Sequence, residues 1–158
     1  MTAINIRHAQ PADAANIAVL YAQLVNNTAM SVLPERITQV AADPDTVLFV
    51  GEKDGHLCAT ALVSLCADVM FGTQPFAVVE NIVVDLVYRG SGVGSLLFRH
   101  IERYCVAAEC SKIMLLSAGD RNQAHRFFER AGFAGSAKRG FVKYRRNFTD
   151  SAPDQVGN

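Results

Sequence analysis

Residues 76–94 read FAVVENIVVDLVYRGSGVG, and this stretch decides the fold. Its first part, residues 76–85, is apolar on both faces apart from Glu80 and Asn81, which predicts a strand in the middle of a sheet. Its last part, Arg89–Gly94, carries three glycines in five positions before an amphipathic helix. Glycine permits backbone angles that a Cβ forbids, so several N–H groups can converge at the positive end of the helix dipole. The stretch therefore resembles a cradle for an anionic group.

Segments of alternating type surround this stretch. Apolar runs bounded by turn residues predict further strands at residues 5–8, 46–52, 56–65, 112–117 and 140–146. Apolar residues at helical spacing predict helices near residues 11–24, 34–42, 93–108 and 124–131. The Asp-Gly pair at residues 54–55 predicts a tight hairpin turn.

The glycine run has three interpretations from its residues alone. A Walker-type phosphate loop is excluded because no Lys followed by Ser or Thr closes the run. A dinucleotide fingerprint fits poorly, since residues 86–89 separate the strand from the glycines and Ser95 stands in the third glycine's place. The third interpretation is a turn whose glycines serve only close packing of the following helix.

Composition limits the class of protein. The chain has 158 residues, half of them hydrophobic, which suffices for one substantial core and leaves no room for two ordinary domains. Fifteen basic and fifteen acidic residues leave no net charge, so we expect no nucleic-acid or membrane partner. The N-terminal residues show no apolar signal core, and no run reaches the roughly 18 apolar residues of a membrane helix, so we expect a cytoplasmic protein.

The cysteines and histidines show no metal-ligand spacing, so we expect no metal site. Cysteine is among the most often buried residue types, and we interpret all four as buried thiols: Cys58, Cys66, Cys105 and Cys110. The histidines at positions 8, 56, 100 and 125 are interpreted as structural.

Two motifs together resemble the GNAT superfamily of acetyltransferases. The first is Asn-Ile-Val-Val-Asp-x-x-Tyr-Arg-Gly-x-Gly-x-Gly at residues 81–94, in which Arg89, Gly92 and Gly94 fill the family's acyl-CoA-binding pattern. The second, at residues 122–133, has an asparagine, an aromatic pair and Gly-Phe on a predicted helix. Both motifs stand in the family's order, and the resemblance covers residues 3–147.

The resemblance implies a fold. It implies an α/β (α+β) architecture, a single GNAT-type domain over residues 1–148, and a polar C-terminal tail at 149–158 that we expect to be disordered. The sheet is expected to be mixed and mostly antiparallel, with six to seven strands splayed at the centre and about four flanking helices. Relatives are often dimers, so a homodimer is a further expectation.

The resemblance also implies how acetyl-CoA, the acyl donor, would bind. The pantetheine arm would lie in the splay like an added strand and bond to backbone groups of Ile82, Val83 and Val84. The pyrophosphate would rest on the amides that lead into the glycine helix, from Arg89, Gly90, Ser91, Gly92, Val93, Gly94 and Ser95. Asn122, through its match to the second motif, would hydrogen-bond the arm.

Glu80 is the candidate catalytic base. It is the one carboxylate within residues 76–84, so desolvation is expected to raise its pKa from about 4.3 toward neutral. The alternative is that Glu80 pairs with an arginine or caps a loop. A backbone N–H at Ile82 or Val83 could meet the oxyanion. The implied reaction transfers an acetyl group from acetyl-CoA to a primary amine of a small molecule or peptide, by direct attack in a ternary complex.

Phe128 departs from the family's pattern. Relatives often carry a tyrosine there, whose hydroxyl protonates the departing thiolate. A thiol with a pKa near about 8.5 can leave without full protonation, and Tyr144 or Ser117 could substitute. The departure keeps a second function open, that of an acyl-CoA-binding sensor or interaction module that transfers nothing. No motif identifies the acceptor amine or the preferred acyl chain.

Overall fold

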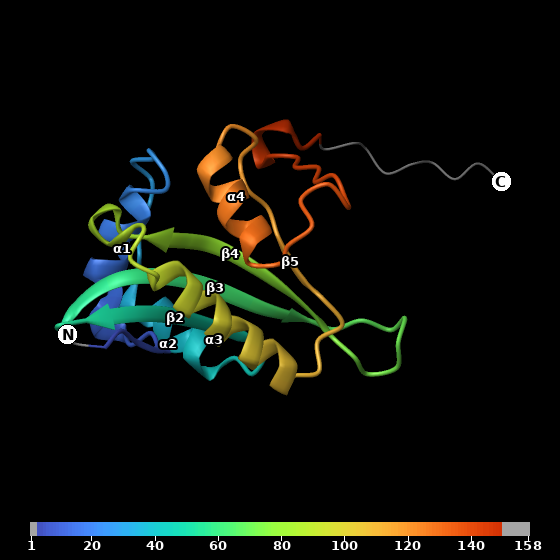
Figure 1. The fold of residues 1–158 in the computed structure, drawn as a ribbon, viewed down its shortest axis with the longest axis horizontal. Coiled ribbons are helices and arrows are strands. Elements are labelled where there is room, and N and C mark those ends of the chain that lie inside the picture. Colours follow the sequence, from blue (N-terminus) through green and yellow to red (C-terminus); the bar gives the residue numbers. More distant parts are fainter. Residues whose placement is uncertain (1–2, 150–158) are drawn as a thin grey trace. The chain divides into compact units, whose positions relative to one another are not determined.

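The computed structural model describes residues 3–149 of the chain. The chain divides into two compact units, residues 1–119 and 120–158, which are described one at a time. Figure 1 shows the ribbon coloured along the sequence.

The first unit contains the sheet and three α-helices. Its strands are β1 (Asn5–His8), β2 (Thr46–Lys53), β3 (His56–Cys66), β4 (Phe76–Val84) and β5 (Ile113–Leu115). Its helices are α1 (Ala14–Ala22), α2 (Pro34–Ala42) and α3 (Val93–Ala107), with short 3-10 turns η1 (Pro11–Asp13) and η2 (Leu86–Tyr88). The second unit contains α4 (Asn122–Arg130) and the 3-10 turn η3 (Arg145–Asn147).

The five strands lie in the order in which they occur in the chain, β1-β2-β3-β4-β5. All neighbours are antiparallel except β4 and β5, which are parallel. The hairpin between β2 and β3 turns at Asp54 and Gly55, which both have positive φ, as a two-residue turn of the predicted kind requires. The expected mixed, mostly antiparallel sheet is confirmed, and the described residues contain four α-helices, as expected.

The strand count is lower than predicted. Residues 140–146 were expected to form a last strand, but the structure has no strand there, and residues 145–147 form η3. A strand exists only where a neighbour pairs with its backbone, and no strand in the described part of the chain pairs with these residues. An apolar run bounded by turn residues was therefore not enough to predict a strand in this segment.

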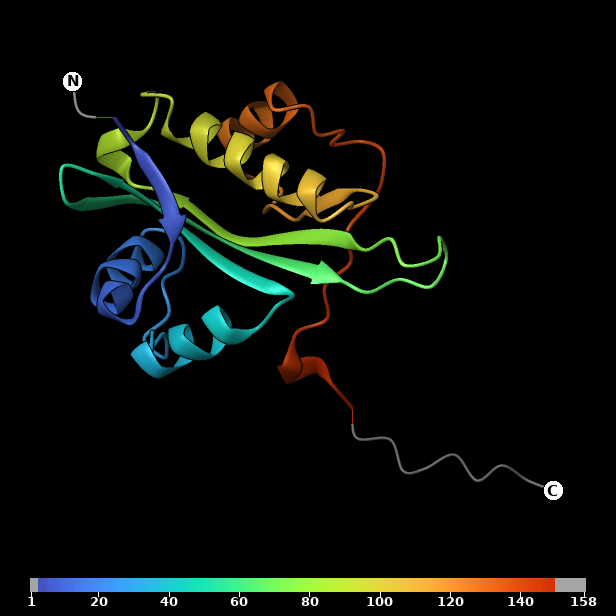
Figure 2. The same cartoon turned by 90° about the horizontal axis from the view of Figure 1, so that it is seen from below.

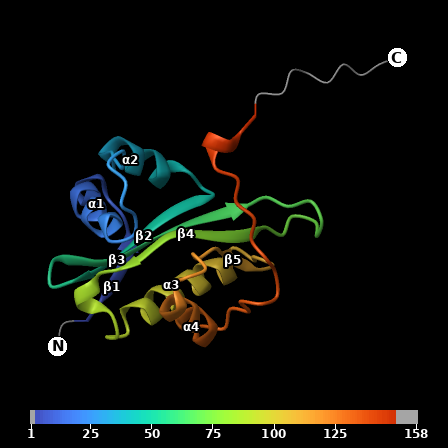
Figure 3. The ribbon, with the colours of Figure 1, turned by 90° about the horizontal axis from the view of Figure 1, so that it is seen from above.

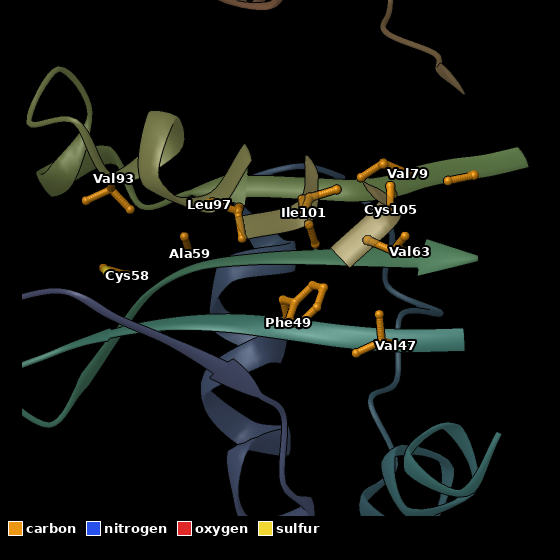
Figure 4. Close-up of a cluster of buried hydrophobic side chains, with 12 residues drawn as sticks. Val47, Phe49, Cys58, Ala59, Val63, Val79, Val93, Leu97, Ile101 and Cys105 are labelled. Carbon is orange, nitrogen blue, oxygen red and sulfur yellow. The ribbon is translucent and has the colours of Figure 1, made fainter. Parts of the chain in front are cut away.

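The two faces of the sheet carry different helices. Figures 2 and 3 show α1 and α2 on one face and α3 on the other. On β2, Val47 and Phe49 pack in a core with α3, whereas Leu48 and Val50 pack in a second core with α1 and α2. This alternation follows from the two-residue period of a strand. Figure 4 shows Phe49 below the α3 residues Leu97 and Ile101.

Hydrogen bonds from one arginine connect β1 to η1, which precedes α1, and to β2. The guanidinium of Arg7 donates two hydrogen bonds to the Asp13 carboxylate, at 2.8 and 3.0 Å, and a third to Glu52 at 2.8 Å. The Gln10 backbone N–H also donates to Asp13. These bonds hold the pKa of the buried Asp13 carboxyl below its ordinary value, chiefly through Arg7.

The end of α3 is closed by a residue in left-handed conformation. Glu109, with φ of 58°, follows the helix, and the Cys110 N–H donates to the Cys105 carbonyl at 2.9 Å. This is the Schellman pattern, which brings the side chains at its two ends together. All four cysteines are free thiols, but the predicted burial holds only for Cys58 and Cys105; Cys66 and Cys110 lie at the ends of elements and are half-buried.

The second unit is built around α4. The ring of Phe128 contacts those of Phe127 and Phe133, at centroid separations of 5.6 and 6.2 Å. Gly132, with φ of 95°, follows α4, so the predicted closure of this helix by glycine is confirmed. Within residues 3–149, no helix is both long and apolar enough to cross a membrane.

Candidate active site

A β-bulge interrupts β4 at the point where its apolar pattern breaks. Thr60 of β3 lies opposite Val83, but Leu62 lies opposite Glu80, so two residues of β4 face one residue of β3. One of the two, Asn81, has φ of 53°, in the left-handed region that asparagine tolerates better than most residues. A bulge bends its strand and redirects its side chains, and bulges are common beside active sites.

The bulge changes which residues face α3. Before it, Ala77 and Val79 pack in the α3 core; after it, Ile82 and Val84 pack against the same core. A regular strand would have continued with residues 81 and 83. Glu80 lies on the opposite face, because its partner Leu62 packs with the α1 and α2 core and residues directly opposite each other share a face.

β4 loses its partner on the β5 side where the bulge begins. The parallel pairing with β5 ends at Val79 and Leu115, while β4 continues to Val84. Val83 and Val84 therefore pair with β3 alone among the described strands, and Ile82 lies in the bulge. This is the splay expected of the sheet, and it leaves one edge of β4 open to an added strand.

Two residues beyond β5 lies an unsatisfied hydroxyl. Ser117 Oγ is buried and has no hydrogen-bond partner, and it is the one such side-chain atom within residues 3–149. Buried polar groups are nearly always satisfied, so an orphan of this kind needs an explanation. Ser117 was predicted to be a strand residue, but β5 ends before it.

The glycine run forms the turn into α3. Gly90 and Gly92 have φ of 78° and 88°, angles that residues with a Cβ rarely adopt. Gly92 caps the helix without a side chain that could accept hydrogen bonds. Among the described residues, no acceptor meets the N–H groups of the first helical turn, which belong to Gly92, Val93, Gly94 and Ser95.

The loop between β4 and these glycines is fixed by its own side chains. Asp85 Oδ1 accepts a hydrogen bond from the Val87 N–H at 3.0 Å, which caps η2. Arg89 Nε donates to the Val84 carbonyl at 3.1 Å, and the Ser91 hydroxyl donates to the Tyr88 carbonyl. The Arg89 side chain is therefore tied to the end of β4, next to the glycine turn that it was expected to flank.

Glu80 is exposed, which corrects the sequence-based expectation that it is desolvated. The expectation assumed a strand covered on both edges and both faces. The bulge and the missing partner on the β5 side leave this part of β4 open to solvent.

Two residues of the second sequence motif, Asn122 and Phe128, lie in the second unit. Asn122 is the first residue of α4, and its backbone N–H donates to the Asp120 carbonyl. Phe128 lies on the same helix. In the first unit, Glu80, Ile82–Val84 and the glycine turn follow one another along one strand and one loop. The roles assigned to Asn122 and Glu80 stay predictions.

Sequence reasoning missed two residues at the end of α1: Tyr21 in its last turn and Gln23, which caps it. Tyr21 was counted only as part of a buried helical stripe, and Gln23 was not considered. The Tyr21 hydroxyl makes a polar contact with the Asn81 side chain, and Gln23 Oε1 accepts a hydrogen bond from the Leu86 N–H at 3.0 Å. Neither contact has a signal in the sequence, because each joins residues about sixty positions apart.

A shallow hollow of about 330 Å³ lies between α1, the start of β3 and η2. Leu20, Leu57, Asp85 and Tyr88 are among its lining residues. Glu80 and the amides of the glycine turn are not part of it, so we do not identify it with the candidate site. No cluster of His, Cys, Asp or Glu within residues 3–149 could hold a metal ion.

Comparison with known proteins identifies the family. The sequence matches the model of the acetyltransferase (GNAT) family over residues 16–133. An aminoglycoside N(6')-acetyltransferase type 1 from Stenotrophomonas maltophilia is 32% identical over 135 residues, which cover 84% of this chain and 87% of that protein.

Solved structures agree with this match. A structure from Agrobacterium tumefaciens str. C58 is 28% identical, with a TM-score of 0.80 over 89% of this chain and 99% of its own. Glucosamine-6-phosphate N-acetyltransferase from Arabidopsis thaliana shares the fold, with 22% identity and a TM-score of 0.79 over 90% of this chain and 99% of its own.

The chain belongs to the acetyltransferase (GNAT) family. It is an acetyl-CoA-dependent N-acetyltransferase that acts on an amine.

Proposed function

We propose that acetyl-CoA binds with its pantetheine arm along β4 and its pyrophosphate at the start of α3. The observation that carries this proposal is the open edge of β4 at residues 82–84. An arm lying there as an added strand would satisfy the backbone groups that β5 leaves unpaired, apart from the Val84 carbonyl, which accepts a hydrogen bond from Arg89. The N–H groups of residues 92–95 would donate to the pyrophosphate oxygens. Asn122 is proposed to hydrogen-bond the arm because it matches the family's second motif.

Glu80 is proposed as the base. Its exposed carboxylate would take a proton from the ammonium nitrogen, directly or through one water, to give the neutral amine. The neutral amine would then attack the thioester carbon, forming the C–N bond, and the C–S bond would break as coenzyme A leaves as a thiolate. The nitrogen would release its second proton to water as the amide forms. A backbone N–H at Ile82 or Val83 would stabilise the oxyanion that forms between these steps.

The leaving thiolate needs a hydrogen-bond donor, because Phe128 supplies none. We favour Ser117 over Tyr144 for this role. The Ser117 hydroxyl is buried and has no partner, so a sulfur at hydrogen-bond distance would satisfy it. The Tyr144 ring is exposed and lies against the Arg146 guanidinium at 4.7 Å. A thiolate is a good enough leaving group to need only this stabilisation.

For the acceptor, we propose an amino group of a polycationic amino sugar. The relative from Stenotrophomonas maltophilia is an aminoglycoside acetyltransferase by name. Such a substrate carries several ammonium groups at neutral pH, and an exposed carboxylate at Glu80 suits the approach of a cation. Asp68, in the loop between β3 and β4, is a second carboxylate that could attract it.

The test is an assay of thiol release from acetyl-CoA with aminoglycosides, polyamines and short peptides as acceptors. Release that depends on an aminoglycoside supports the proposed acceptor, and release with peptides alone contradicts it. Acetyl-CoA binding without release by any of these amines contradicts the proposed acceptor class. Absence of both heat and thermal shift with millimolar acetyl-CoA would contradict the proposed binding mode.

A homodimer and a cytoplasmic location are also proposed. Four large apolar side chains close together in the sequence of the second unit are exposed to solvent: Phe141, Val142, Tyr144 and Phe148. Exposed apolar patches often mark interaction surfaces, so this segment supports a dimer contact. Light scattering coupled to gel filtration tests it, with a dimer mass expected for the wild type and a shift toward monomer for Phe141→Ser. A monomeric wild type contradicts the proposal.

A further inference from the structure

The C-terminal end of α1 makes two side-chain contacts, one with the open part of β4 and one with η2, which follows it. One is the polar contact between the Tyr21 hydroxyl and the Asn81 side chain, which lowers the pKa of that hydroxyl. The other joins Gln23 Oε1 to the Leu86 N–H at 3.0 Å. Asn81 begins the open segment and Leu86 follows its end, so α1 holds residues 81–86 at both ends. We call these two contacts the α1 clamp.

Residues 81–86 need such support for two physical reasons. Asn81 adopts a left-handed conformation, which is unfavourable for a residue with a Cβ. Residues 82–84 also lack a strand partner on the β5 side among the described strands. A strand edge with unpaired N–H and C=O groups tends to recruit a partner, and straightening β4 onto β5 would provide one. Contacts that fix the bulge oppose this closure.

The Tyr21 contact is suited to this purpose. Tyr21 packs against the core between α1, α2 and the sheet, so its ring is held in place. Burial raises the pKa of the hydroxyl and outweighs the opposite effect of the Asn81 contact. Tyr21 is therefore neutral at physiological pH, and its hydroxyl oxygen can accept a hydrogen bond from the Asn81 amide.

We propose that Tyr21 and Gln23 are positioning residues that keep β4 open for the pantetheine arm of acetyl-CoA. They act through Asn81 and Leu86 and do not touch the reacting atoms. Without the clamp, part of the binding free energy of acetyl-CoA is spent on reopening the gap, so its affinity falls. This inference rests on the proposed binding of acetyl-CoA along β4.

The test measures coenzyme A binding by calorimetry in five variants of the full chain. Tyr21→Phe and Gln23→Met each remove one contact of the clamp. Gln23→Glu keeps an acceptor oxygen for the Leu86 N–H. Tyr104→Phe removes a hydroxyl from a half-buried tyrosine on α3 and is the matched control for Tyr21→Phe. The Tyr21→Phe/Gln23→Met double variant removes the whole clamp.

Each clamp-breaking single variant is expected to raise the Kd for coenzyme A about threefold to tenfold, the range for loss of one hydrogen bond. The double variant is expected to raise it further, whereas Gln23→Glu and Tyr104→Phe stay within about twofold of the wild type. Unchanged Kd in Tyr21→Phe and Gln23→Met overturns the proposal. An equal loss in Tyr104→Phe also overturns it, because the effect is then not specific to the clamp.

Hydrogen exchange separates the clamp from the proposed binding mode. Open-edge amides of residues 82–84 in the ligand-free protein are expected to exchange at least about tenfold more slowly in the double variant, because closure onto β5 gives them partners. The Leu86 amide, which loses its acceptor Gln23 Oε1, is expected to exchange faster. A wild type that does not bind coenzyme A contradicts the proposed function, but this exchange result still supports the clamp. Unchanged exchange overturns the clamp even if coenzyme A binds to the wild type.

Discussion

Leu62 of β3 lies directly opposite Glu80 of β4, so the Glu80 carboxylate projects from the face of the sheet that α1 and α2 cover. Ile82 and Val84, two and four residues later, pack on the other face with α3. The bulge at Asn81 thus divides β4 into a stretch that presents the proposed base and a stretch that presents open backbone groups. In the proposed mechanism, the amine and the acyl donor reach β4 from different sides.

The first prediction concerns this carboxylate. Glu80→Gln keeps the size of the side chain but cannot take a proton, so kcat for the amine acceptor is expected to fall at least about 100-fold. The Kd for acetyl-CoA is expected to change by less than about twofold, because the cradle lies elsewhere. Thiol-release kinetics and calorimetry measure the two effects. Glu102→Gln, an exposed glutamate on α3, is the control with the same loss of charge. Unchanged kcat in Glu80→Gln would remove Glu80 from the mechanism.

The second prediction concerns the turn before α3. Gly92 has φ of 88°, so Gly92→Ala forces an alanine into the left-handed region at a cost of about 1–2 kcal/mol. We expect a lower free energy of unfolding and at least about tenfold weaker binding of coenzyme A, because the first-turn N–H groups shift. Urea denaturation and calorimetry measure both quantities.

Gly119→Ala is the control for this variant. Gly119 has open space around its Cα and no positive φ, so this substitution should leave stability nearly unchanged. If Gly92→Ala binds coenzyme A as tightly as the wild type, the glycine turn serves helix packing alone.

The third prediction concerns pH. Arg7 lowers the pKa of the buried Asp13 carboxyl, whose ordinary value is 3.8. A carboxyl with a lowered pKa in the folded state stabilises the fold fully above its unfolded pKa, and the stabilisation is lost as pH falls through the folded pKa. Arg7→Met leaves Asp13 without its strongest partner, so we expect a loss of about 1–3 kcal/mol at pH 7. The loss should shrink toward pH 2. Urea denaturation across this range measures it, and an equal loss at every pH would contradict the assignment to Asp13.

The fourth prediction concerns the end of α3. Glu109 has φ of 58° at the position where helices usually place glycine. Glu109→Gly removes the Cβ strain and should raise the free energy of unfolding by about 0.5–1 kcal/mol, which corresponds to a few degrees in Tm. Differential scanning calorimetry measures the change. Glu109→Ala keeps the strain and should not stabilise the protein; if it stabilises as much as glycine, the charge of Glu109 is responsible and the backbone is not.

Local patterns were sufficient to predict most of the fold. Asp54 and Gly55 specify their turn because few other residues accept positive φ twice in succession. The glycines at 90 and 92 likewise revealed the entry to α3. The segment at 140–146 was predicted wrongly because an apolar run bounded by turn residues does not by itself supply a neighbouring strand.

The candidate site was less predictable from sequence. The break in the apolar run at Glu80 and Asn81 was visible, and the motif named the residues around it. Its meaning as a bulge was not visible, because a bulge is defined by the register with β3. The same register decides that Glu80 is exposed, so the expected desolvation was wrong. The α1 clamp depends on packing between distant segments, which no local pattern encodes.

The order of the sheet has a consequence for how the protein assembles. Strands β2, β3 and β4 follow one another as two hairpins, whereas β5 reaches β4 only after α3 has crossed the sheet. Local hairpins form faster than pairings that must close a long loop, so we expect the parallel β4–β5 seam to form after the two hairpins. Only three residue pairs hold that seam. A ligand that bridges it should therefore slow local opening there more than anywhere else in the molecule.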